Sequence, residues 1–152
     1  MLEAGDRIPN LEVTDSDGDR VTDQDLASGR VVLFFYPKDD TPGCTREACD
    51  FSHQLADFTA LNVDVYGVSA DDEASHLAFI GRHGLRVQLL SDPTHAMCEA
   101  FGVWGTQFYG DHTYEGIART TFVLQDGVVD RVYRHVQVDG HVALVLAYLR
   151  GA

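Results

Sequence analysis

Short apolar runs alternate along this chain with stretches in which apolar residues recur every three or four positions. An uninterrupted run is typical of a strand buried on both faces, because a strand with one wet face alternates apolar and polar residues. We therefore predict a buried strand over Val31–Tyr36, a run too short to cross a membrane. The same reasoning predicts further strands over Val63–Ser69, Val87–Leu90, Thr120–Gln125 and Val128–Arg134.

Polar caps, prolines and glycines mark where the predicted helices begin and end. Thr41-Pro42 predicts one start, with Thr41 as the N-cap and Pro42 at the first helical position, where its missing N–H costs nothing. Asp71 or Asp72 begins a second helix, which Gly84 ends. Two further helices are predicted, from Asp92-Pro93 to Phe101 with Gly102 closing it, and after an Asp139 cap with Val142, Val145, Leu146 and Leu149 facing inward.

Turn signals complete the pattern. Asp17-Gly18 predicts a hairpin whose first strand contains Leu11 and Val13 and whose second strand contains Val21. Asp126-Gly127 predicts a second hairpin, which joins the last two strands. A short helix is predicted from Thr22, with Asp25 three residues on, to near Gly29. The stretch from Trp104 to Gly116 has turn residues and aromatics without a period, so we predict a loop there.

The order of these elements predicts the fold class. Alternation of strands and helices, followed by a hairpin and a final helix, indicates an α/β fold with a central mixed β-sheet flanked by helices. That order suits a thioredoxin-like fold with an N-terminal β-hairpin extension. A length of 152 residues suits one domain over 1–152.

Composition and charge exclude several classes of function. Apolar residues make up 45% of the chain, which is typical of a globular protein, and the net charge of −13 argues against a nucleic-acid partner. The N-terminus lacks a charged segment followed by an apolar one, and no apolar run suits a membrane span, so a cytoplasmic protein is expected. Three cysteines, an odd number, argue against a framework of structural disulfides.

Cys44 is the first candidate for chemistry. The predicted start at Thr41-Pro42 places it in the first helical turn, where free N–H groups and the helix dipole favour a thiolate, which is the nucleophilic form. The neighbouring charges leave this open, because Asp39 and Asp40 would oppose ionisation while Lys38 and Arg46 would favour it, and sequence does not show where they point. An ordinary buried thiol is the alternative.

Cys49 follows Cys44 by five residues. In an intact helix the two thiols point about 140° apart and their Cα atoms are roughly 8.6 Å apart, beyond the ~7 Å limit for a disulfide. Either the pair never bonds, or the helix unwinds when it does. One apolar face contains Cys44 but not Cys49, and its members are Cys44, Ala48, Phe51, Leu55 and Phe58. A buried nucleophile and a second thiol that reaches it only after unwinding suggest a two-step redox cycle.

The segment YPKDDTPGCTREAC resembles the active-site signature of peroxiredoxins, through Pro37, Thr41 and Cys44. Cys49 matches the resolving position of the bacterioferritin comigratory protein (PrxQ) subfamily. The likeness extends over nearly the whole chain, through the motifs GDRIPNLEVTDSDGD, VYGVSADD, LLSD, CEAFGVWG and YEGIARTTFVL.

This resemblance implies a thioredoxin-dependent peroxidase. Cys44 would reduce hydrogen peroxide or organic hydroperoxides and become a sulfenic acid, Cys49 would resolve it as an intramolecular disulfide, and thioredoxin or a similar dithiol would reduce that disulfide. Arg119 falls at the family's active-site arginine, where a fixed guanidinium would favour the thiolate and bind the peroxide oxygens. Thr41 would cap the helix and bond to the thiolate or peroxide, and Pro37 and Pro42 would shape the pocket. The resemblance implies a monomer that needs neither metal nor organic cofactor.

Other interpretations of the same residues are weaker. The cysteine pair could serve a redox-sensing or thiol-chaperone module that turns over little peroxide. Cys49-x3-His53 and His95-x2-Cys98 could supply zinc ligands, although nothing in the sequence brings them together, and Cys98 is otherwise a structural thiol. The three aspartates around Gly18 do not follow the spacing of a calcium loop. The remaining histidines are predicted to lie on the surface: His76, His83, His112, His135 and His141.

Overall fold

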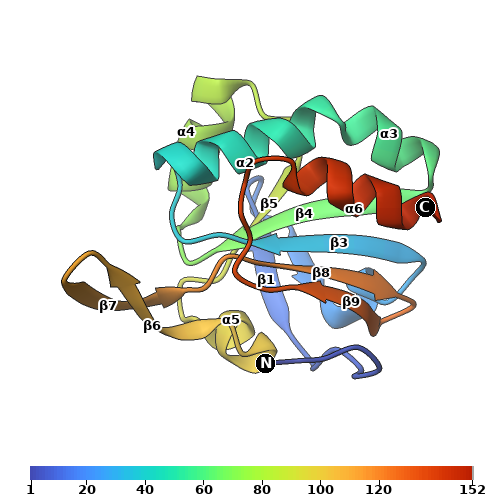
Figure 1. Cartoon of the computed structure of the whole chain (residues 1–152), viewed down its shortest axis with the longest axis horizontal. Coiled ribbons are helices and arrows are strands. Elements are labelled where there is room, and N and C mark those ends of the chain that lie inside the picture. Colours follow the sequence, from blue (N-terminus) through green and yellow to red (C-terminus); the bar gives the residue numbers. More distant parts are fainter. Residues whose placement is uncertain (152) are drawn as a thin grey trace.

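Seven strands form one mixed sheet in a computed structural model that describes residues 1–151 (Figure 1). Their order across the sheet is β2-β1-β5-β4-β3-β8-β9. β3 pairs in parallel with β4 and β4 with β5, and every other pairing in this sheet is antiparallel. The bounds are β1 (Glu12–Asp15), β2 (Arg20–Thr22), β3 (Arg30–Phe35), β4 (Val63–Ser69), β5 (Gln88–Ser91), β8 (Thr120–Gln125) and β9 (Val128–Tyr133).

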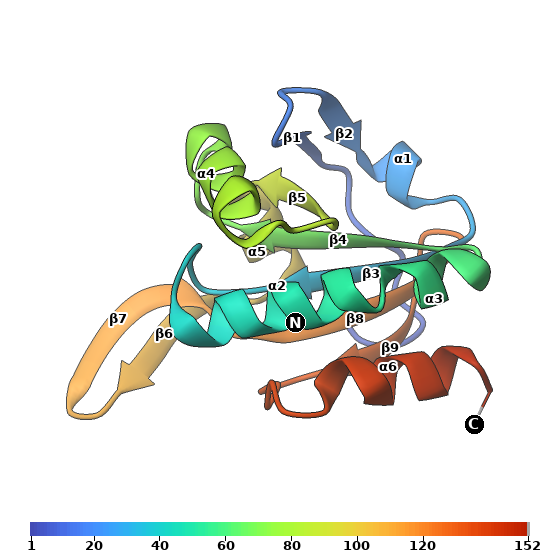
Figure 2. The same ribbon diagram turned by 90° about the horizontal axis from the view of Figure 1, so that it is seen from above.

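Helices cover both faces of this sheet. Most of them lie on one face, whereas α5 lies on the other (Figures 1 and 2). The bounds are α1 (Asp23–Leu26), α2 (Pro42–His53), α3 (Leu55–Ala60), α4 (Glu73–His83), α5 (Ala96–Phe101) and α6 (His141–Leu149). Among the described residues, no helix is both long and apolar enough to span a membrane.

The central strand β3 explains why the core has two halves. Val32 and Phe34 point toward α2, α4 and α6, while the alternate residues Val31, Leu33 and Phe35 point toward α5. All five side chains are fully buried, as the unbroken apolar run predicts. The fold class is therefore the predicted mixed sheet flanked by helices, and the N-terminal hairpin pairs β1 with β2 at its edge.

The prediction of a loop from Trp104 to Gly116 is wrong. This stretch forms a separate antiparallel hairpin of β6 (Trp104–Tyr109) and β7 (His112–Ile117), which projects from the body at the end of the molecule where α2 begins (Figures 1 and 2). Phe108 and Tyr109 near its tip are 76% and 78% exposed. Because water reaches most of both faces, the hairpin has no alternation of apolar and polar residues that sequence could reveal.

Two predicted helix starts also differ from the structure, since the cap of α5 is His95 in place of Asp92 and the cap of α6 is Gly140 in place of Asp139. α5 begins at Ala96, and the Asp92 carboxylate reaches forward to accept hydrogen bonds from the N–H groups of Met97 and Cys98, at 3.1 and 2.7 Å. α6 is capped by Gly140 with φ 75°, and Asp139 instead forms an ion pair with Arg46 of α2. Asp92 thus still accepts from first-turn N–H groups of α5, from a position before the cap, whereas the side chain of Asp139 is taken by a contact with a distant helix.

A matched pair of leucines on α6 tests the burial of its inner face. Leu146 is 3% exposed and Leu144 is 64% exposed. We expect Leu146→Ala to lower the free energy of unfolding by about 2–5 kcal/mol, because it leaves a cavity beside α2. Leu144→Ala should change it by less than about 0.5 kcal/mol. Urea denaturation of both variants measures this difference, and equal losses would contradict the packing described here.

Candidate active site

The loop after β3 leads into the first turn of α2, where Cys44 lies. Thr41 has the extended backbone of an N-cap (φ −85°, ψ 153°) and Pro42 is the first helical residue, as predicted. The predicted side-chain cap is absent, because the Thr41 hydroxyl donates to the Lys38 carbonyl at 2.8 Å instead. Among the described residues, no side chain therefore caps the first-turn N–H groups of α2, and Cys44 beside them is 1% exposed.

Arg119 reaches Cys44 from across the fold. It stands between β7 and β8, and its Nη2 donates to the Cys44 Sγ at 3.4 Å although the two residues are 75 positions apart in sequence. β8 pairs with β3, the strand that leads into the Cys44 loop, so the sheet itself brings the guanidinium to the sulfur. Gly43 leaves the room it needs, since a Cβ there would lie 3.1 Å from Nη2.

Glu47 completes this cluster and escaped the sequence analysis. Its Oε1 accepts from Arg119 Nη1 at 2.7 Å, whereas Oε2 has no hydrogen-bond partner among the described residues. Burial raises the pKa of Glu47 to about 7, against the lowering effect of the Arg119 charge. The signal for it was present, because Glu47 lies three residues after Cys44 and so shares its helix face. The apolar pattern hid it, since that pattern follows only apolar side chains.

The charges beside Cys44 in sequence all point elsewhere. The Asp39 carboxylate is buried against α4, and Asp40 forms an ion pair with Arg82 and a hydrogen bond with His83 at the far end of that helix. Arg46 pairs with Asp139, and Lys38 is exposed. The conflict of local charges that sequence left open is therefore removed by tertiary contacts, which leave Arg119 as the cation on the sulfur.

The other two cysteines differ from Cys44 in their surroundings. Cys49 is half-buried and packs against the margin of the apolar cluster that contains Cys44, and burial followed by the charge of Asp50 raises the pKa of its thiol. Cys98 is fully buried on the opposite side of the sheet, where burial and Asp92 raise the pKa of its thiol far above the ordinary range. All three cysteines are free thiols in this structure.

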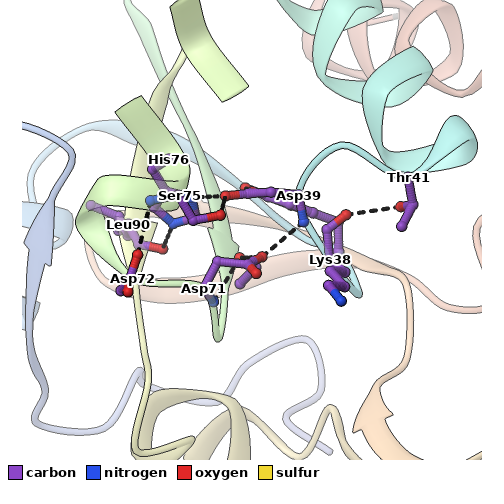
Figure 3. A network of polar contacts seen from close by, with 10 residues as sticks. Lys38, Asp39, Thr41, Asp71, Asp72, Ser75, His76 and Leu90 are labelled. Carbon is purple, nitrogen blue, oxygen red and sulfur yellow. Dashed lines mark hydrogen bonds and ion pairs between the residues drawn. The ribbon is translucent and has the colours of Figure 1, made fainter. Parts of the chain in front are cut away.

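Two histidines predicted to lie on the surface are buried. His141 bonds through Nε2 to the Thr121 hydroxyl at 2.8 Å, and burial together with the Arg119 charge lowers the pKa of His141 to about 4, so it is neutral. His76 is enclosed between Asp39 and the Leu90 carbonyl (Figure 3). Sequence could not reveal either, because isolated histidines carry no periodic signal.

The structure does not assemble the zinc ligands considered above. Among residues 1–151, three potential ligands approach within 4.8 Å of one another in two groups, Asp15 with Asp17 and Asp19, and Asp39 with Asp71 and His76. Neither group contains a cysteine. In the first group, the Asp15 carboxylate accepts from the N–H groups of Asp17 and Asp19, both at 2.9 Å, which is a polar turn.

Comparisons with known proteins identify the family and fold that this chain resembles. A family model described as the AhpC/TSA family matches residues 4–132. The chain is 37% identical over 150 residues to Peroxiredoxin Bcp of Escherichia coli, which covers 98% of this chain and 96% of that protein. A mutant of Xylella fastidiosa PrxQ superposes with a TM-score of 0.93 at 32% identity, covering 99% of this chain and 97% of that one.

A further solved structure comes from Xanthomonas campestris. It is a bacterioferritin comigratory protein described through trapped intermediate and ligand complexes that bear on its alkyl peroxide reduction activity. Its TM-score is 0.86 at 37% identity, covering 93% of this chain and 90% of that one.

Replacing Glu47 by glutamine tests the acid beneath Arg119. Folding raises the pKa of Glu47 to about 7 from an ordinary 4.5. The protonated carboxyl therefore contributes its full stabilisation of the folded state below pH 4.5, and this stabilisation is lost as pH rises toward 7. The shift corresponds to about 3 kcal/mol. We expect urea denaturation to show this loss between about pH 4.5 and 7 in the parent, and its absence in Glu47→Gln. Parallel stability curves would contradict the raised pKa.

Proposed function

The chain belongs to the AhpC/TSA family as a peroxiredoxin of the Bcp (PrxQ) type and is a thiol peroxidase, and on this premise we propose that Cys44 attacks the peroxide and Cys49 resolves the product. The observation that carries the first role is the 3.4 Å hydrogen bond from Arg119 Nη2 to the Cys44 sulfur. A guanidinium binds a thiolate more strongly than a thiol, so this contact favours the nucleophilic form.

In the first step, the Cys44 thiolate attacks the terminal oxygen of a hydroperoxide. An S–O bond forms and the O–O bond breaks, so that the sulfur is oxidised to a sulfenic acid and the peroxide is reduced to water or an alcohol after taking a proton. Arg119 stands where the negative charge develops and is held there by Glu47, which is the arrangement expected for electrostatic stabilisation. The free N–H groups of the first turn of α2 add donors on the same side.

In the second step, Cys49 condenses with the sulfenic acid. Both cysteines belong to the continuous helix α2, in which a five-residue spacing separates the Cα atoms by roughly 8.6 Å, too far for a disulfide. The first turns of α2 must therefore unwind. Unwinding also exposes Cys49 and removes the burial that raises its pKa, which makes it a better nucleophile at that moment. The S–S bond forms, the S–O bond breaks and water leaves.

In the third step, an external dithiol such as thioredoxin reduces the disulfide by thiol–disulfide exchange. Cys98 is a poor alternative resolver, because it lies in the core on the opposite face of the sheet from Cys44. The substrates we propose are hydrogen peroxide and organic hydroperoxides. The Xanthomonas relative supports this choice through its described alkyl peroxide reduction.

Peptide mapping after one equivalent of hydrogen peroxide tests the pairing directly. We expect mass spectrometry of the alkylated protein to find a Cys44–Cys49 disulfide, with Cys98 still able to react with the alkylating reagent once the protein is unfolded. A Cys44 sulfenic acid without that disulfide would leave the peroxidatic role intact and refute the resolving role. An unmodified Cys44 would refute both roles.

Serine substitutions separate the two cysteines by turnover. Cys44→Ser should abolish peroxide consumption, because it removes the nucleophile. Cys49→Ser should consume one equivalent of peroxide in a burst and then stall with thioredoxin as the reductant, because no disulfide forms. The measurement is peroxide consumption with a thioredoxin system, and normal steady-state turnover in Cys49→Ser would overturn its role. Stoichiometric oxidation without turnover in the parent would favour a redox sensor or thiol chaperone instead.

The guanidinium is tested by Arg119→Lys, which keeps the charge and removes the two-pronged contact with Glu47 and Cys44. We expect kcat/KM for hydrogen peroxide to fall by about 10- to 100-fold. Arg46→Lys is the matched control, because Arg46 is in α2 two residues from Cys44 and forms an ion pair only at the exposed surface. It should change kcat/KM by less than about twofold. Equal effects in the two variants would contradict a specific role for Arg119.

A further inference from the structure

The loop that precedes Cys44 is fastened to α4 through the Asp39 side chain (Figure 3). The Asp39 carboxylate accepts from the Tyr36 hydroxyl at 2.6 Å, from the Ser75 hydroxyl at 2.8 Å, and meets Nδ1 of His76 at 2.7 Å. The Asp39 backbone N–H donates to Asp71 at 2.8 Å. We call this group of residues the Asp39 anchor. Its centre is buried, since His76 is 0% and Asp39 is 7% exposed, whereas Asp71 and Ser75 are partly exposed.

The contacts of His76 determine its protonation. Nδ1 faces a carboxylate oxygen of Asp39, and Nε2 faces the backbone carbonyl of Leu90 at 3.0 Å. Both partners accept hydrogen bonds, so both ring nitrogens must carry a proton to satisfy them, and the ring is an imidazolium. A neutral ring would leave one nitrogen lone pair against an acceptor oxygen inside the protein, which is costly.

The groups around His76 favour that proton. Asp39 approaches from the loop before α2, Asp71 from the loop before α4, and the Tyr36 ring from the end of β3, and none of these carries a positive charge. Burial by itself lowers the pKa of His76, but the hydrogen bond and charge of Asp39, the Leu90 carbonyl and the charge of Asp71 together raise it above its ordinary value of 6.5.

The anchor makes the buried contact between this loop and α4. The Thr41 hydroxyl bonds backward to Lys38, so among the described residues no side chain caps the helix, and Asp39 lies five residues before Cys44. Asp40 adds more exposed contacts with Arg82 and His83 of the same helix. Asp39 is therefore the buried link between α4 and the segment that leads into the first turn of α2.

We propose that His76 is a positioning residue for Cys44: its imidazolium fixes Asp39 and thereby keeps the first turn of α2 wound beneath Arg119. Loss of the proton or of the ring shifts this turn toward the unwound state. If the function proposed above is right, that state is the one in which Cys49 reaches Cys44. The wound state serves peroxide reduction and the unwound state serves resolution, so His76 sets the balance between the two steps.

The direction with pH follows from the raised pKa of His76. A histidine whose pKa is higher in the folded state contributes its full stabilisation below the pKa of the unfolded chain and loses it as pH rises through the folded value. The first turn of α2 should therefore open more readily above the folded pKa of His76. Cys49 also ionises as pH rises, so the opening must be measured without any thiol chemistry.

Hydrogen exchange in the fully reduced protein meets this requirement. We expect peptides covering residues 41–46 to exchange about tenfold faster in His76→Gln than in the parent near pH 6, after correction for intrinsic rates, because one charged hydrogen bond is lost. The difference should shrink as pH rises, since the parent loses the same bond. His83→Gln is the matched control, because His83 lies on the same helix but binds Asp40 at the surface. In His83→Gln, the exchange rate of residues 41–46 should still increase with pH as it does in the parent.

Any of four results would overturn the proposal. The first is unchanged hydrogen exchange of residues 41–46 in His76→Gln. The second and third concern the rise of the exchange rate with pH: it persists in His76→Gln, or it disappears in His83→Gln. The fourth is an NMR titration in which the pKa of His76 lies below its ordinary value. Should His76→Gln fail to fold, Tyr36→Phe removes a neutral donor to Asp39 and keeps His76. It should speed exchange of the same peptides and retain the rise of the exchange rate with pH, and unchanged exchange would likewise refute the anchor.

Rapid-quench peptide mapping links the anchor to the redox cycle. We expect the Cys44–Cys49 disulfide to form faster in His76→Gln than in the parent near pH 6. We also expect kcat/KM for peroxide to fall in this variant. A uniformly weakened fold would not produce a faster second step together with a slower first step. Slower or unchanged disulfide formation would refute the proposed balance between the two steps. If the parent forms no such disulfide, the resolving role of Cys49 fails, and the exchange measurement still decides whether His76 positions the first turn.

Discussion

The contact between Arg119 and Cys44 is the interaction on which the arrangement of this site depends. A single guanidinium donates to a sulfur at 3.4 Å and to the Glu47 carboxylate at 2.7 Å, so it links two residues of α2 to the strand β8. That link exists because β8 lies beside β3 in the sheet and runs antiparallel to it, so that β3 ends and β8 begins near the start of α2. The antiparallel pairing of β3 with β8 is thus a requirement of the chemistry as well as of the core.

A second constraint comes from placing two thiols in one helix. The helix that buries Cys44 and directs it toward Arg119 also keeps Cys49 too far away to form a disulfide. A thiol peroxidase that uses both cysteines therefore needs a helix start that is stable enough to bind peroxide and weak enough to open. The absence of a side-chain cap at Thr41 and the dependence on a buried, protonated His76 meet that need together.

The sequence predicted most of the elements, because strands and helices leave local patterns. The apolar run of β3, the Thr41-Pro42 start of α2 and the Gly84 and Gly102 helix ends are all observed. The errors have two causes. The β6–β7 hairpin is largely exposed and Asp92 bonds to N–H groups further along than a cap would, so in both cases the local pattern was incomplete. Asp139, His76 and His141 have partners far away in sequence, which no local pattern reveals.

The sequence by itself determined that Cys44 lies in the first turn of a helix with Cys49 five residues beyond it, because both facts depend only on local caps and helical spacing. It also placed Arg119 next to a strand, and only family resemblance suggested why. The tertiary structure alone decided which charges meet the sulfur: it turned Asp39, Asp40 and Arg46 away and brought Arg119 and Glu47 in. Electrostatic contacts act through space, and the order of strands in the sheet, which no local pattern encodes, sets those distances.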